Sequence, residues 1–180
     1  IHGTAFQAAM VSELCDPVLF GSKNNILVTS KGLGARGFIL KNVPENKDNL
    51  YIQQLQLLLD DGLEEKLIRF LEQEQLKSIH IFGEVFGAGV QDLTYGQIKP
   101  TFRMFDIAIN KQYVNFDTMH DLNEQYLNLP TVPVLYDGPF ERDLIATFVD
   151  GKDTISGTNI REGVVIRGIG NHPRFGRKIA

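Results

Sequence analysis

An α+β fold is predicted by two features of the sequence: strand-like runs outnumber helical stretches, and the two kinds of element do not alternate regularly. Most of the runs are bounded by Gly, Pro, Asn or Asp, as strand ends commonly are. They span residues 4–11, 25–30, 37–40, 78–82, 102–109, 146–149 and 163–167. A regular alternation with helices would have indicated a doubly wound parallel sheet. We therefore expect an antiparallel α+β sandwich.

A helical stretch follows the third of these runs. Segments 50–59 and 63–76 place apolar side chains at intervals of three and four residues, the spacing of one face of an α-helix. Gly62 interrupts the pattern, so the prediction is a pair of amphipathic helices whose leucines belong to the core. Shorter helices are expected at residues 118–126 and 138–145.

Size and composition are those of one compact domain. The chain has 180 residues, of which 43% are hydrophobic and 22% are charged, enough for an ordinary core. It contains no apolar run of about 18 residues that could span a bilayer, and it opens on no signal-peptide pattern. We therefore expect a soluble, cytoplasmic protein that does not bind membranes. Cys15 is the only cysteine, which excludes an internal disulfide, and the four histidines lack zinc-ligand spacing.

The charge distribution leaves nucleic-acid binding open. The net charge is −4, but binding a phosphate needs only a local basic patch. Residues 161–178 contain five basic side chains and one acidic one, hence a local charge of +4. This segment is either a solvated face or a phosphate-binding one, whereas the acidic stretch 60–74 is best explained as a solvated face.

A glycine-rich stretch at residues 32–37, GLGARG, matches the GxGxxG pattern of dinucleotide-binding loops. Such a loop opens a helix whose N-terminus faces the pyrophosphate. Here residues 38–43 instead form a strand-like run that ends at Pro44. The prediction is therefore a glycine-rich hairpin and not a dinucleotide-binding loop.

Three acidic residues stand at the ends of predicted strands. Glu84 lies between two glycines, Glu162 precedes another glycine, and Asp106 ends an apolar run. Glycines allow a ligand to approach the backbone closely. Each acid by itself is commonly a turn residue or an ion-pair partner. Together they are candidates for binding metal-bound water, ribose hydroxyls or both.

Four short motifs resemble those of one enzyme superfamily, in the same order along the chain. Ile1-His2-Gly3-Thr4 resembles the end of the Lys-x-His/Asp-Gly nucleophile motif of covalent nucleotidyltransferases. Residues 82–87, FGEVFG, are similar to their motif III, residues 102–107, FRMFDI, to motif IIIa, and residues 162–167, EGVVIR, to motif IV. Histidine before Gly3 is typical of the RNA ligases of this superfamily, of the phage end-sealing and kinetoplastid editing type. DNA ligases and capping enzymes usually have aspartate there.

The resemblance implies a fold and a reaction. The fold is a nucleotidyltransferase, or ATP-grasp-like ligase adenylation, domain: two antiparallel β-sheets flanked by helices, with ATP between them and Mg²⁺ at the phosphates. A lysine attacks the α-phosphate of ATP, AMP passes to an RNA 5′-phosphate, and a 3′-hydroxyl displaces AMP to join the RNA ends. The lysine would immediately precede Ile1, and the motif V lysines would follow the last residue. We therefore expect residues 1–180 to be one domain, truncated at both ends, inactive by itself and accompanied by a further domain.

The resemblance also implies roles for individual residues. Phe105 would stack on the adenine, Glu84 would contact the nucleoside or metal-bound water, and Glu162 would lie near the α-phosphate and the metal. The expected catalytic residues are Glu84, Glu162 and Lys31, and the two glutamates are the expected metal ligands. Lys31 and Arg167 would supply positive charge at the phosphates. The expected nucleotide-binding residues are Ile1, His2, Gly3, Lys31, Glu84, Phe105, Asp106, Glu162 and Arg167.

Other functions remain open. Ala5 stands where close relatives often have asparagine, so the role of that asparagine is unfilled or moved elsewhere. One alternative is a DNA ligase or a capping-type nucleotidyltransferase, which joining of DNA nicks or preference for GTP would favour. The other is a non-catalytic module that binds a nucleotide or an RNA end, which a chain without the lysine would suit.

Overall fold

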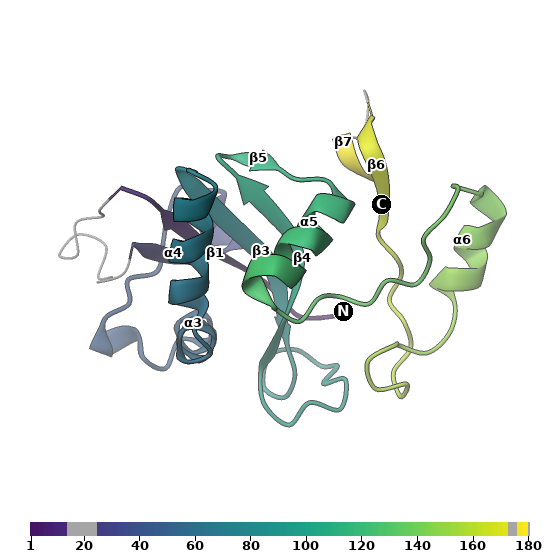
Figure 1. The fold of residues 1–180 in the computed structure, drawn as a ribbon. Coiled ribbons are helices and arrows are strands. Elements are labelled where there is room, and N and C mark those ends of the chain that lie inside the picture. The colour runs from purple at the N-terminus through teal and green to yellow at the C-terminus, as the bar shows by residue number, and fades with distance from the viewer. Residues whose placement is uncertain (14–24, 173–175, 180) are drawn as a thin grey trace.

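The computed structural model describes residues 1–13, 25–172 and 176–179, so Cys15 lies outside the described residues (Figure 1). Within them, neighbouring strands of a five-stranded sheet are antiparallel and follow the order β2-β1-β3-β4-β5. Its strands are β1 (Thr4–Val11), β2 (Ile26–Ser30), β3 (Ser78–Phe86), β4 (Thr101–Ile109) and β5 (Gln112–Tyr113). A second antiparallel sheet pairs β6 (Ile166–His172) with β7 (Gly176–Ile179). The predicted α+β class is confirmed.

Two α-helices follow β2, after a 3₁₀ turn at Pro44–Asn46. The helices α3 (Leu50–Asp60) and α4 (Leu63–Gln73) meet at Gly62, whose φ of +80° is a left-handed conformation that favours glycine. The side chain of Asn49 caps α3 by accepting hydrogen bonds from two amides of its first turn. The predicted helix pair is thus confirmed. Each helix has 11 residues, and no helix of the described part is long and apolar enough to cross a membrane.

Helices cover one face of the main sheet. Along that face α3, α4 and α5 (Phe116–Leu122) pack against β2, β3 and β4, and the π-helical turn after α5 (Asn123–Leu127) packs against α4 and α5. Alternate residues of each strand enter this core, and those of β1 are Phe6, Ala8 and Met10. The intervening residues, among them Glu84 of β3, point to the opposite face of the sheet.

Two predicted strands near the C-terminal end differ from the structure. Residues 146–149 belong to the helix α6 (Arg142–Val149), because so short a segment, with three apolar residues and Thr147, does not by itself distinguish a strand from the last turn of a helix. None of the residues of α6 is buried, and Figure 1 shows this helix standing apart from the main sheet. The strand predicted at 163–167 begins only at Ile166.

The glycine-rich stretch also differs from its prediction. Instead of a hairpin it opens on the one-turn helix α2 (Lys31–Gly34), because the side chain of Ser30 accepts a hydrogen bond from a backbone amide of that turn. Residues 37–40 form no continuous strand, and Leu40 makes a single antiparallel bridge to Val28.

Candidate functional site

His2 and Glu162 meet although 160 positions separate them in the sequence. The Nδ1 atom of His2 is hydrogen-bonded to Oε1 of Glu162, and their side chains are 39% and 41% exposed. His2 lies just before β1, and Glu162 lies in the segment that leads into β6. The contact therefore joins two distant parts of the chain at a position open to solvent.

Gly3 brings Glu84 to the same place. The backbone of Gly3 runs so close to β3 that a Cβ atom on Gly3 would lie 2.3 Å from the carbonyl oxygen of Val85, so only glycine fits. This approach allows the backbone amide of Gly3 to donate a hydrogen bond to the Glu84 carboxylate. We call His2, Gly3, Glu84 and Glu162 the carboxylate cluster.

A buried tyrosine contacts the cluster, and the sequence had not singled it out. The Tyr95 hydroxyl accepts a hydrogen bond from the backbone amide of His2 over 2.6 Å, and only 2% of this residue is exposed. Burial raises the pKa of Tyr95, and the negative charges of Glu162 and Asp153 raise it further. In the sequence, the feature that could have pointed to Tyr95 is its position before Gly96, and an aromatic residue before glycine also occurs in ordinary turns.

A closed loop holds the chain just before Glu162. The Asp153 carboxylate accepts hydrogen bonds from the backbone amides of Ile155, Ser156, Gly157 and Asn159. Burial by itself would raise the pKa of Asp153, but these bonds outweigh burial and hold the pKa well below its usual range. Arg161 closes the loop by donating to backbone carbonyls of Phe148 and Lys152. Glu162 therefore follows a segment whose backbone is tied down.

Phe105 lies at an irregularity of the main sheet. The pairing of β3 with β4 shifts at this point, since Phe82 pairs with Asp106 whereas Gly83 pairs with Met104. Phe105 is thus the extra residue of a β-bulge, a feature that re-aims side chains. Its side chain is only partly buried, in contrast to the fully buried Met104 before it.

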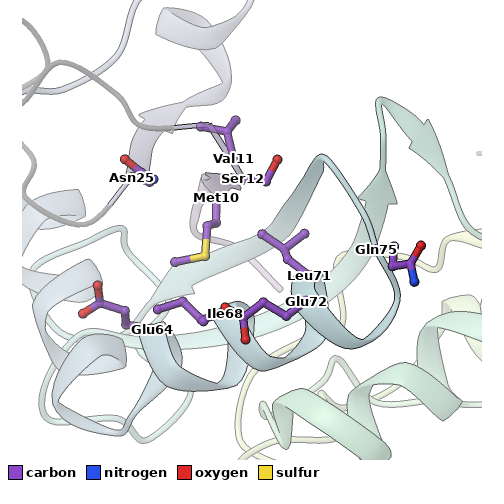
Figure 2. Close-up of a pocket in the computed structure, with 9 residues that line it drawn as sticks. All are labelled: Met10, Val11, Ser12, Asn25, Glu64, Ile68, Leu71, Glu72 and Gln75. Atoms are coloured by element: carbon purple, nitrogen blue, oxygen red, sulfur yellow. The ribbon is translucent and has the colours of Figure 1, made fainter.

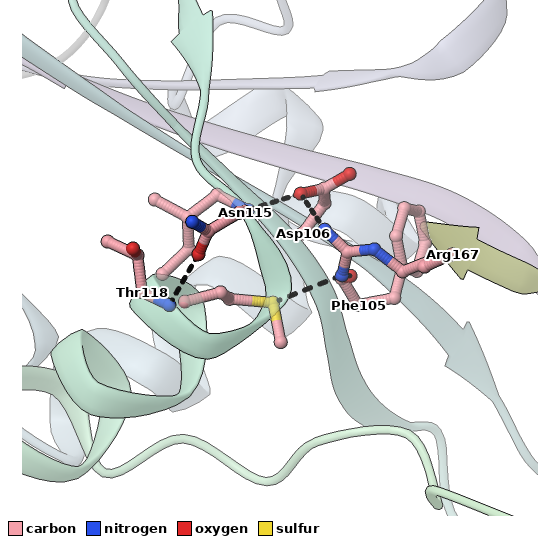
Figure 3. A network of polar contacts seen from close by, with 7 residues as sticks. Phe105, Asp106, Asn115, Thr118 and Arg167 are labelled. Atoms are coloured by element: carbon pink, nitrogen blue, oxygen red, sulfur yellow. Dashed lines mark hydrogen bonds and ion pairs between the residues drawn. The ribbon is translucent and has the colours of Figure 1, made fainter. Parts of the chain in front are cut away.

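Beside the bulge, Arg167 forms a network with protein groups (Figure 3). Its guanidinium bonds the carboxylate of Asp106 over 3.1 Å and the backbone carbonyl of Phe105 over 3.0 Å, and it contacts the sulfur of Met119. It also lies over the ring of Phe116, 5.5 Å from its centre. Asp106 is 1% exposed. The structure therefore pairs Arg167 with Asp106, and their predicted roles in nucleotide binding stay predictions.

Lys31 is an exposed residue at the start of α2. Ser30 pairs with Phe6, and Phe6 pairs with Gly83. Lys31 follows Ser30 and Glu84 follows Gly83, so both lie at the same end of the sheet. Two strand spacings, about 10 Å, separate these positions. Lys31 thus lies on the same side of the molecule as the carboxylate cluster but outside it.

The family of the chain follows from its sequence. The RNA ligase family model matches residues 1–180, the whole length. This chain is a member of the RNA ligase family. No curated protein sequence matches it at a significant level.

Solved RNA ligases have the same fold as this member of the family. A structure of Naegleria gruberi RNA ligase with pyrophosphate superposes with a TM-score of 0.67 at 18% identity, over 99% of this chain and 46% of that one. Two lysine variants of that ligase, one with ATP and Mn and one with AMP and Mn, each have a TM-score of 0.68 at 18% identity, over the same 99% and 46%. The chain therefore spans about half the length of these ligases, and the likeness concerns the fold.

Two of the Naegleria gruberi ligase structures contain Mn together with ATP or AMP, and the carboxylate cluster of this chain has oxygen ligands of the kind that a divalent cation takes. Burial raises the pKa of Glu84, and the negative charge of Glu162 raises it further, whereas a cation between them would favour the charged form. No group of three or more His, Cys, Asp or Glu in the described part of the chain could hold a metal by itself. Magnesium commonly takes one or two carboxylates and completes its shell with phosphate oxygens and water. Glu84 and Glu162 suit that mode of binding.

A cavity of about 410 Å³ lies elsewhere in this RNA ligase fold (Figure 2). The cavity is formed between α4 and the end of β1, and its lining includes Met10, Ser12, Ile68 and Glu72. Because Gly3 precedes β1 and Ser12 follows it, the strand's length of about 26 Å separates this cavity from the carboxylate cluster. The cavity is therefore distinct from the candidate site.

Proposed function

We propose that this chain is the nucleotide-binding core of an ATP-dependent RNA ligase that forms a lysyl-AMP intermediate and joins RNA 5′-phosphate and 3′-hydroxyl ends. The observation that carries the proposal is the meeting of His2, Glu84 and Glu162. These residues belong to three separate motifs, and nothing in local sequence requires them to be neighbours. Their convergence within an RNA ligase fold supports a shared adenylate site.

The nucleophile would be a lysine immediately before Ile1. Ile1 directly precedes His2, which meets Glu162, so a residue before Ile1 would lie near the cluster. Lysine attacks only in its unprotonated form, and its ordinary pKa is about 10.4, so its surroundings must favour the neutral amine. Under this proposal residues 1–180 alone form no lysyl-AMP.

The remaining roles follow from position. Glu162, fixed by His2 and by the loop before it, would act at the α-phosphate, and Glu84 at the ribose or at metal-bound water. The partly buried ring of Phe105 would stack on adenine. Mg²⁺ bound by Glu84 and Glu162 would neutralise charge on the phosphates. Lys31, which stands on the same side of the molecule, would attract the triphosphate.

The test is adenylation of the protein extended by its native residues on both sides. Incubation with α-labelled ATP and Mg²⁺ should give a covalent, acid-labile label on the extended protein and none on residues 1–180. Glu162→Ala should reduce labelling at least about a hundredfold, the scale of a lost group that acts in the transition state. Glu45→Ala, which changes an exposed glutamate far along the chain, is the matched control and should label normally.

Several results would contradict the proposal or favour an alternative to it. A residue other than lysine before Ile1 would remove the nucleophile, and full labelling of Glu162→Ala would make that carboxylate structural. Labelling by GTP in preference to ATP, or joining of nicked DNA in preference to RNA, would favour a capping enzyme or a DNA ligase. An extended protein that binds ATP without becoming labelled would be a non-catalytic binding module.

A further inference from the structure

Among the residues that the structure describes, the hydroxyl of Tyr95 is the side-chain group that hydrogen-bonds the backbone of His2. It accepts a 2.6 Å hydrogen bond from the amide of His2 across 93 positions of sequence. That amide and the carbonyl of Ile1 belong to one planar peptide group. Fixing the amide therefore also fixes the direction in which the chain passes through Ile1, toward the position of the proposed nucleophile.

The tyrosine is presented by a tight turn. The amide of Gln97 donates to the carbonyl of Thr94 over 3.0 Å, and the two residues between them, Tyr95 and Gly96, have φ values of +53° and +72°. Positive φ at both central positions is typical of a type I′ turn. For an aromatic residue this conformation is uncommon and carries strain. Such strain is retained where the side chain must reach a particular place.

The ring of Tyr95 is anchored independently of its hydroxyl. It packs edge-on against Phe86 at the end of β3, with the ring centres 5.6 Å apart and the planes at 90°. The loop before Glu162 lies over the same turn, because a Cβ atom on Gly96 would be 3.4 Å from Cβ of Ser156. Removal of the hydroxyl alone should therefore leave the ring in place.

We infer that Tyr95 is a positioning residue for the adenylation reaction: its hydroxyl fixes the backbone of His2, so that the His2 side chain meets Glu162 and the residue before Ile1 faces Glu84. The inference rests on the proposed function. The Tyr95 hydroxyl contacts the backbone amide of His2 and the carboxylate of Glu162, so its effect on the reaction passes through these two groups. Removal of the Tyr95 hydroxyl should slow the chemical step and leave the binding of ATP intact.

The experiment compares Tyr95→Phe with Tyr126→Phe in the extended protein. Tyr126 is a matched control, because it is 6% exposed, packs edge-on against Phe70 and donates its hydroxyl to Glu74 over 2.5 Å, remote from the cluster. Loss of the hydrogen bond in Tyr95→Phe should slow lysyl-AMP formation at saturating ATP about tenfold without changing the KM for ATP. It should also speed hydrogen exchange of the His2 backbone amide about tenfold, since that amide loses its acceptor. The control should change neither quantity.

The outcomes separate this inference from the proposed function. If the unmodified extended protein forms no lysyl-AMP, the proposed function fails, and with it any role of Tyr95 in adenylation. If the unmodified protein is active and Tyr95→Phe matches its rate, the inference about Tyr95 is wrong while the proposed function stands. Equal slowing in Tyr126→Phe, or unchanged exchange of the His2 amide in Tyr95→Phe, would also overturn it.

Discussion

The Arg167–Asp106 pair and the His2–Glu162 pair resemble each other in chemistry and differ in their surroundings. The first pair is 13% and 1% exposed, and Arg167 also binds the carbonyl of Phe105. The second pair is 39% and 41% exposed and adjoins a further carboxylate, that of Glu84. Buried ion pairs need all their partners, whereas half-exposed ones contribute little to stability. One pair therefore supports the fold, and the other is available for a ligand.

The comparison shows that the position of an acidic residue relative to a predicted strand does not tell whether its side chain is buried in an ion pair or open to solvent. Glu84 follows the predicted strand 78–82, Glu162 precedes the predicted strand 163–167, and Asp106 lies within the predicted strand 102–109. Asp106 is buried, and Arg167 reaches it from β6 and bonds its carboxylate, while its predicted role in nucleotide binding stays a prediction. Glu84 is only partly buried and Glu162 is exposed, and their neighbours are a glycine backbone and a histidine.

The largest expected effect is the loss of stability in Arg167→Met, which breaks the buried pair. Removing the guanidinium leaves the buried charge of Asp106 without its partner, which should lower the free energy of unfolding by about 3–5 kcal/mol. Lys66→Met is the matched control, because Lys66 pairs with Asp61, which is 74% exposed, and the change should cost about 1 kcal/mol or less. Urea denaturation measures both values.

A double variant sharpens this prediction. Combining Arg167→Met with Asp106→Leu removes both charges and should recover much of the lost stability. If Arg167→Met proved no more costly than Lys66→Met, the pair would not support the fold as described.

An effect of intermediate size, on the affinity for ATP, is expected for Phe105→Ala. This residue borders both regions, since its carbonyl binds Arg167 and its ring is partly exposed at the bulge. Loss of stacking on the base should weaken ATP binding by about 1–3 kcal/mol, measured by calorimetry. Phe82→Ala removes a neighbouring aromatic side chain of β3, whose partner in the ladder is Asp106, and is the matched control. Equal losses of affinity in both variants would show a general effect of the aromatic surface and not a role of Phe105.

The smallest expected effect is a pH dependence of protein stability that comes from Glu84. Because folding raises the pKa of this carboxyl above its ordinary value of 4.5, the folded state holds its proton more tightly than the unfolded state. Stability is therefore lost as the pH rises from 4.5 through the folded pKa. Glu84→Gln, which keeps an acceptor for the amide of Gly3, should raise the melting temperature at pH 7, and the difference should shrink toward zero below pH 4.5. A difference independent of pH would exclude burial of the charge as its cause, and Glu45→Gln should show none.

Much of the fold could be predicted where a pattern extends over many residues. The helix pair at 50–60 and 63–73 was evident because its leucine spacing is maintained over several turns and broken at Gly62. The strand predicted at 146–149 is wrong, because a four-residue segment with three apolar side chains fits a strand and a helix equally well. At Lys31–Gly34, capping by Ser30 outweighed the glycine content of the stretch.

The carboxylate cluster and its contacts could be predicted only in part, because some of them join residues far apart in the sequence. Motif order pointed to His2, Glu84 and Glu162, and the structure brings these residues together. Their catalytic and metal-binding roles, and that of Lys31, stay predictions. Tyr95 was missed because its hydrogen bond to His2 spans 93 positions and leaves no periodic signal.

By itself, the sequence determined the antiparallel α+β class, the amphipathic helices and the order of the motifs, since these depend on neighbouring residues and on periodicity. Only the tertiary structure decided which acids are buried and which stay accessible, how the bulge at Phe105 is formed, and that Tyr95 holds His2. The physical reason is that burial and hydrogen bonding at each of these groups are set by residues tens to more than a hundred positions away, which no local pattern specifies.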